Sequence, residues 1–157
     1  MSRTWLGSMI AIALLGGAPA RAIAGGKEHK VDVSGEVDTA RGIAYVEDGR
    51  VGPVLFRQVI FQNIPNEGEL RDADADDRAR VLPVLVLSNL GSSRAKLDLK
   101  LQLEDDLDRV VMTCTVSRYQ GTDRNDLMDK LCGGNESMLT IDWPKVKVVR
   151  LVGMVTE

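Results

Sequence analysis

Ten consecutive residues near the middle of the chain alternate strictly between apolar and polar side chains. The apolar members are Ala95, Leu97, Leu99, Leu101 and Leu103, and the polar members are Arg94, Lys96, Asp98, Lys100 and Gln102. A period of two places all the leucines on one face of a strand, whereas a helix would spread them around its surface. Although leucine favours helices, the pattern predicts a β-strand with one buried and one solvated face.

A second alternating run follows after the acidic turn at 104–108. Its apolar positions are Val110, Met112, Cys114 and Val116, and polar residues separate most of them. Two alternating strands joined by a short polar turn are typical of an antiparallel hairpin. We therefore expect 94–103 and 109–117 to pair with each other.

Six further runs have the apolar, β-branched character of strands, at 30–37, 42–47, 54–62, 81–90, 138–143 and 145–155. One helix is predicted over 121–135, where Leu127, Met128 and Leu131 share a side and Gly133-Gly134 supplies a stop. About eight strands with short turns predict an all-β protein, an antiparallel two-layer β-sandwich with one short helix in a connection. A small β-barrel is the alternative.

The first 24 residues have the three-part order of a cleavable secretory signal peptide. Arg3 precedes an apolar run at 5–15, and small residues follow it. Three Ala-x-Ala cleavage sites end at Ala20, Ala22 and Ala24, and the last is favoured because the chain becomes flexible and charged after it. We expect 25–157 to be a single β-sandwich domain that is periplasmic or extracellular. The apolar run is too short to span a bilayer, so no membrane insertion is expected after cleavage.

The charge balance of the chain is negative, with 20 basic and 23 acidic residues and a net charge of −3. Cleavage after residue 24 would remove two arginines and no acid, which makes the net charge −5. A negative chain is a poor partner for nucleic acid and for an anionic membrane surface. We therefore expect no nucleic-acid partner.

Two cysteines, Cys114 and Cys132, lie in the part of the chain after the predicted cut. In an oxidising compartment an even number of cysteines is most simply read as a disulfide. The sequence therefore predicts a Cys114–Cys132 bridge that pins the connection after the second hairpin strand.

Residues suited to catalysis are scarce. His29 is the only histidine and stands a few residues after the predicted cut, where we expect a mobile terminus. Without another imidazole or a free thiol, no nucleophile–base pair can be assembled. No glycine-rich phosphate loop is present, and no cofactor is expected. The sequence indicates a non-enzymatic protein, with a carboxylate-based hydrolase as a remote alternative.

Clusters of acids at 72–77 and 104–108 suggest a different chemistry. Loop carboxylates bind calcium, and alternating strands would bring both clusters to the same end of a sandwich. The candidate metal ligands are Asp72, Asp74, Asp76, Glu104 and Asp106. An EF-hand is excluded, because Asp77 occupies its glycine position and Pro83 replaces its final glutamate. A calcium-dependent binding module is therefore an alternative function, and a solvated acidic face explains the same residues without a metal.

The last strand is apolar on both faces, which is typical of a strand that is central or covered by a partner. The candidate partner surface consists of Trp143, Val146, Val148, Val152 and Met154. We expect a protein partner, of unidentified nature, to pair here by strand addition. The leading hypothesis is an exported, non-enzymatic β-sandwich that acts as a binding, adaptor or assembly component through protein–protein contacts.

Overall fold

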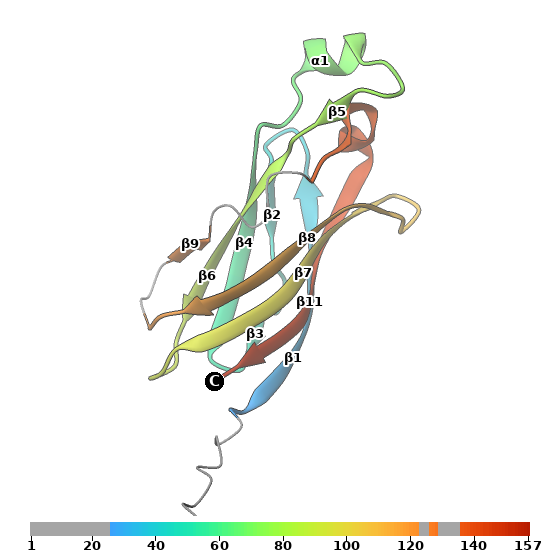
Figure 1. The fold of residues 1–157 in the computed structure, drawn as a ribbon. Helices are drawn as coiled ribbons and strands as arrows, with labels where there is room; N and C mark the ends of the chain where they lie inside the picture. The colour runs from blue at the N-terminus through green and yellow to red at the C-terminus, as the bar shows by residue number, and fades with distance from the viewer. Residues whose placement is uncertain (1–25, 123–125, 129–135) are drawn as a thin grey trace, which may run out of the picture.

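The computed structural model describes residues 26–122, 126–128 and 136–157, so the predicted signal peptide lies outside the described residues. Within them a nine-stranded antiparallel sheet folds at β1 into two layers, called the first and second sheets below, and β5 and β10 form a separate two-stranded sheet (Figure 1). The elements are β1 (Glu28–Asp38), β2 (Ile43–Tyr45), β3 (Arg50–Val51), β4 (Val54–Gln62), α1 (Glu67–Asp72), β5 (Arg78–Ala79), β6 (Leu82–Asn89), β7 (Ala95–Asp105), β8 (Val110–Gln120), β9 (Asp126–Met128), β10 (Met138–Leu139), the 3-10 helix η1 (Thr140–Lys145) and β11 (Val146–Thr156). The predicted all-β antiparallel sandwich is confirmed.

The first sheet has the strand order β8-β7-β11-β1. Its β7–β8 hairpin is the one that the alternating pattern predicts, with Leu101 opposite Cys114 and Leu99 opposite Val116. All the apolar residues of the ten-residue run are buried, with at most 1% of their surface exposed. The alternation therefore sets which face of the sheet points into the core.

The second sheet has the order β1-β2-β4-β6-β9, with β3 paired to β4. Strand β1 belongs to both sheets: Glu28–Glu36 pairs with β11, and Val37 and Asp38 pair with β2. The two layers are thus joined along one side by a shared strand. Along the other side the sheets stay open, because β8 and β9 each have a single partner strand among the described residues. The small-barrel alternative is therefore not adopted.

The core lies between the two sheets and is closed at one end by η1. Trp143 of η1 is 2% exposed and meets Phe61 of β4 edge-on, with 5.5 Å between ring centroids and an angle of 65°. Its indole Nε1 donates a hydrogen bond to the backbone oxygen of Thr39 at 3.2 Å. A buried indole needs such a partner for its N–H, so Trp143 is anchored as part of the core.

The helix predicted over 121–135 is wrong where the structure describes that segment. Asp126–Met128 form β9, antiparallel to Leu85–Leu87 of β6, and residues 123–125 and 129–135 lie outside the described residues. A run this short fits a strand as well as a helix, and pairing with the edge of β6 decides between them. The α-helix forms instead at Glu67–Asp72, where Asn66 and Glu69 make a reciprocal capping box.

Candidate functional site

One end of the sandwich, which we call the loop end, carries α1, β5, η1 and the β7–β8 turn at 105–109 (Figure 1). Arg78 of β5, Asp105 and Arg109 of the turn, and Asp142 and Lys145 of η1 line a single hollow of about 450 Å³. No acid of the segment 72–77 lines this hollow, whereas Arg78, which directly follows that segment, does. The side chains that line this hollow carry both charges, since Arg78, Arg109 and Lys145 lie among Asp105 and Asp142.

Asp105 is the buried acid of the loop end, with 1% of its side chain exposed. Its Oδ1 accepts hydrogen bonds from the backbone N–H groups of Leu107 and Arg109, both at 2.9 Å. Its Oδ2 accepts from Nε of Arg109 at 2.8 Å. The side-chain hydrogen bond from Arg109 is the main cause that lowers the pKa of Asp105 from 3.8 to about 2. Asp105 is thus an ionised carboxylate that fixes the turn.

Sequence reasoning did not single out Asp105, because it stands inside a run of acids that reads as one solvated or metal-binding cluster. The spacing Asp105-x-Leu107-x-Arg109 is the signal that would have found it. An aspartate that accepts from the backbone two residues later is the usual anchor of an Asx turn, and an arginine four residues later can reach its other oxygen.

The five candidate metal ligands are all described. Asp72 ends α1, and Asp74 lies in a tight turn where its N–H donates to Oδ2 of Asp77 at 2.8 Å. Glu104 and Asp106 flank the buried Asp105. Among the described residues, no three histidine, cysteine, aspartate or glutamate side chains lie close enough together to hold a metal ion. The structure therefore places no three of the candidate ligands around one cation.

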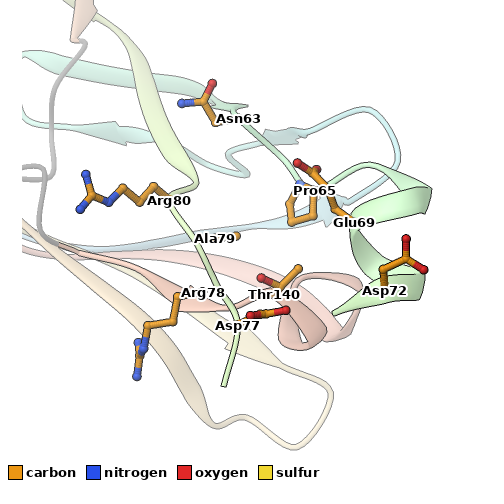
Figure 2. Close-up of a pocket in the computed structure, with 9 residues that line it drawn as sticks. All are labelled: Asn63, Pro65, Glu69, Asp72, Asp77, Arg78, Ala79, Arg80 and Thr140. Atoms are coloured by element: carbon orange, nitrogen blue, oxygen red, sulfur yellow. The ribbon is translucent and has the colours of Figure 1, made fainter. Parts of the chain in front are cut away.

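A polar groove of about 480 Å³ lies beside this hollow, between α1 and β5 (Figure 2). Its lining consists of Asn63, Pro65, Glu69, Asp72, Asp77, Arg78, Ala79, Arg80 and Thr140. Arg78 and Arg80 extend away from Asp72, while Asp77 lies beside Thr140, whose backbone N–H donates to the Asp77 carbonyl at 2.8 Å. Glu69 is engaged by the capping box. The groove offers scattered polar groups to a ligand.

His29 does not lie on a mobile terminus, and that expectation is wrong. It stands in β1 opposite Val155, and its side chain is 19% exposed. Its Nε2 lies 2.9 Å from Oε1 of Glu157, and its ring lies against Gly52, where an added Cβ would meet the ring at 2.6 Å. His29 therefore links β1 to Glu157. Pairing of β1 with β11 holds the residue in place, and its closeness in sequence to the predicted cut did not indicate this.

The predicted Cys114–Cys132 bridge falls partly outside the described residues, because Cys132 is not among them. Cys114 is described and is completely buried on the inner face of β8. A cysteine in that position is shielded from solvent, which suits a structural role more than a nucleophilic one.

The candidate partner surface separates into buried and outward-facing parts. Trp143 and Val146 belong to the core, with 2% and 0% exposure. Val148, Val152 and Met154 are half-buried on the outer face of the first sheet, beside the ion pair of Arg150 with Asp32. Strand β11 is hydrogen-bonded to β1 along one edge and to β7 along the other. Strand addition to β11 is therefore wrong, because neither of its edges is open.

Within the described residues, β8 is the end strand of the same sheet. We call the side of Val110–Gln120 that faces away from β7 the β8 edge. Among the described residues β8 pairs only with β7. Cys114 and Gln120 make further contacts, and β10 lies close to the start of β8. Native edge strands are usually protected by prolines, inward charges, β-bulges or shortness. Strand β8 has eleven residues, no proline, glycine or acid, and one charge, Arg118, and its pairing with β7 is bulged between Val110 and Met112.

Exposed apolar residues lie at both ends of this strand. Five large apolar side chains are exposed in the described part of the chain, and three of them, Leu107, Val110 and Tyr119, belong to β8 and its turn. Leu107 and Val110 lie at the start of β8 and Tyr119 near its end, so the three form no continuous patch. The position of β8 at the end of its sheet makes its edge the candidate functional surface.

No protein-family model, curated protein or solved structure matches this chain. None of the helices in the described part of the chain is long and apolar enough to cross a membrane. The candidate sites therefore rest on the geometry and chemistry of the fold.

Proposed function

We propose that this chain is an exported, non-enzymatic β-sandwich that works by binding another protein, as an adaptor or assembly component. The observation that carries the proposal is the position of β8, an eleven-residue strand that, among the described strands, is paired with β7 alone, while Cys114 and Gln120 within it make further contacts. An extended segment that adds to such an edge gains affinity from main-chain hydrogen bonds and specificity from every second side chain. Binding would thus need no cofactor.

The edge is already ordered before any partner arrives, which supports the proposal. At its start, Asp105 and Arg109 fix the turn into β8. Farther along, the hydroxyl of Ser117 donates to Oδ1 of Asp98 at 2.6 Å, and the guanidinium of Arg94 lies 5.3 Å from the centroid of the Tyr119 ring. A surface that is rigid in its bound form loses less entropy on association.

The compartment belongs to the same proposal. The first 24 residues have the composition of a signal peptide, so the domain would be delivered to the periplasm or the extracellular space. There a Cys114–Cys132 bridge would hold the connection after β8 close to that strand. A disulfide-stapled sandwich suits a protein that persists outside the cell.

Photo-crosslinking tests the proposal at a matched pair of tyrosines. Tyr119 on β8 is 63% exposed, and Tyr45 on β2 in the other sheet is 66% exposed. A photoreactive phenylalanine analogue is placed at each position in turn, in the cells that produce the protein. We expect a discrete adduct with a protein from position 119 and none from position 45. Equal labelling from both positions, or none from position 119, would overturn the proposal.

A further inference from the structure

We infer that the hollow between α1 and η1, which we call the α1 hollow, is a docking pocket for an aromatic side chain of a partner protein, next to a basic residue of that partner. The inference rests on the proposed function in one respect, that the ligand belongs to a protein. It does not involve the β8 edge, because the hollow lies at the loop end beside α1.

The α1 hollow has a volume of about 490 Å³, which is within the range of pockets that bind ligands. Apolar residues form most of its lining, which consists of Thr39, Ala40, Ile64, Pro65, Asn66, Glu67, Leu70, Trp143 and Pro144. Prolines and an indole present flat surfaces, against which an aromatic ring packs well. The size and the lining therefore fit one bulky aromatic side chain.

Helix α1 forms one wall of the hollow and is not packed into the core. It has six residues, and none of them is buried. It stands beyond the ends of the two layers (Figure 1). So short a helix gains little stability from its own hydrogen bonds, and its one apolar side chain, Leu70, is half-buried and lines the hollow. A ring that fills the hollow would give α1 the packing partner that the core does not provide.

The opposite wall is held in place by the core. Trp143 is 2% exposed, and its indole Nε1 donates to the backbone oxygen of Thr39 at 3.2 Å. Its ring also meets Phe61 edge-on. This contact fixes η1 against the turn after β1 before any ligand arrives, and a preformed wall loses less entropy on binding.

Charge at the hollow favours a basic neighbour of the aromatic residue. Among the described residues that line the α1 hollow, Glu67 alone is charged, and it forms no ion pair with a described residue. A basic residue beside the ring would be attracted to this carboxylate, and an acidic residue would be repelled, which selects between partners. An anionic lipid chain would meet the same repulsion, so a basic peptide is the better ligand.

Nuclear magnetic resonance of the full exported chain tests the inference. Trp143 is the only tryptophan after the predicted cut, so its indole N–H gives a single resolved signal in a proton–nitrogen spectrum. We expect the peptide acetyl-Phe-Lys-amide to shift this signal saturably, with a dissociation constant of about 1 mM. Acetyl-Gly-Lys-amide should leave the signal in place, and acetyl-Phe-Glu-amide should bind several times more weakly than the lysine peptide.

Two pairs of variants locate the binding. Ala40→Phe fills the hollow from its own lining, whereas Ala75→Phe adds the same ring to an exposed position of the turn after α1, outside the lining. We expect the first to abolish the saturable shift and the second to retain it. Glu67→Gln should make the lysine and glutamate peptides bind equally. Asp72→Asn, which removes an acid of the same helix outside this lining, should keep their difference.

The outcomes separate the inference from the proposed function. No saturable shift in the wild type, an equal shift from the glycine peptide, or a shift that survives Ala40→Phe would overturn the hollow as a docking pocket. Tighter binding of decanoate than of the aromatic peptide would also overturn it, because the hollow would then accept a lipid chain. A position-119 adduct without any peptide shift removes the hollow and leaves protein binding in place. A peptide shift without that adduct supports the hollow and removes the contact at β8.

Discussion

Arg109 contacts the carboxylate of Asp105 through its backbone N–H at 2.9 Å, its guanidinium Nε at 2.8 Å and its guanidinium Nη2 at 2.7 Å. The arginine is 64% exposed, whereas the carboxylate that it holds is 1% exposed. An exposed guanidinium therefore neutralises a buried carboxylate, and their contact fixes the turn that precedes β8. Because β8 carries the proposed contact edge, the geometry of this turn also orients that edge.

Asp105→Asn should lower the melting temperature at neutral pH by several degrees, because the charge-assisted hydrogen bonds to Arg109 are weakened. The pKa of Asp105 lies near 2 in the folded chain, below the ordinary value of 3.8. Its ionisation therefore stabilises the fold above about pH 4, and this stabilisation is lost as the pH falls toward about 2. The variant should show a shallower fall in melting temperature across that window, measured by circular dichroism.

Asp106→Asn is the control for this prediction, because Asp106 is the exposed neighbour in the same turn. It should keep both the melting temperature and the pH profile of the wild type. If both variants changed the acid profile equally, the general charge of the cluster and not the Asp105–Arg109 pair would be responsible.

Gly153→Ala should destabilise the fold by about 2–4 kcal/mol. Gly153 lies in β11 with φ +145°, and an added Cβ would sit 2.1 Å from the carbonyl oxygen of Asp98 in β7. The backbone conformation and the contact both exclude a side chain, so β7 and β11 would have to separate. Gly121→Ala is the matched control, because no atom of the described residues lies within 4 Å of its added Cβ. Chemical denaturation of both variants measures the difference, and equal stabilities would contradict the close approach.

Reduction should lower the free energy of unfolding by about 3 kcal/mol if Cys114 and Cys132 are bridged, since the bond closes a short loop. Intact-mass spectrometry of the exported chain should show a protein two hydrogen atoms lighter than its reduced form. Uptake of two alkylating groups by the unfolded chain without prior reduction would show instead that both thiols are free, and the proposed staple would be lost.

Millimolar calcium should leave the melting temperature unchanged, because no three of the described acids surround one cation site. A ligand that binds the folded state alone would raise the melting temperature with its concentration. A saturable rise with calcium that disappears in Asp74→Asn would contradict this expectation and restore the calcium-binding alternative.

The sandwich could be predicted because the strands with the strictest apolar–polar alternation also show which face of the sheet is buried. The alternation of leucines from Leu97 to Leu103 admits one buried side only, and the hairpin with β8 follows from the short turn. The helix was predicted in the wrong place because the three apolar residues Leu127, Met128 and Leu131 fit either a helix or a strand. Pairing of Asp126–Met128 with β6, which is distant in sequence, makes this segment a strand.

The candidate site was harder to predict because it depends on strand order. The last strand is apolar on both faces, which is consistent with a partner on its edge as well as with a central place. Its pairing with β1 and β7 joins segments from opposite ends of the chain, and no local pattern encodes that order. Asp105 was hidden for a related reason, because burial distinguishes it from Glu104 and Asp106 and composition does not.

Strand β1 pairs with β11 from Glu28 opposite Thr156 to Glu36 opposite Val148. Strand β1 can therefore complete its pairing with β11 only after the chain has been synthesised as far as Thr156. Until then β1 cannot join the two layers, and contacts so distant in sequence form slowly. During synthesis the chain would thus remain without a closed sandwich, which is the state in which a polypeptide can be threaded across a membrane.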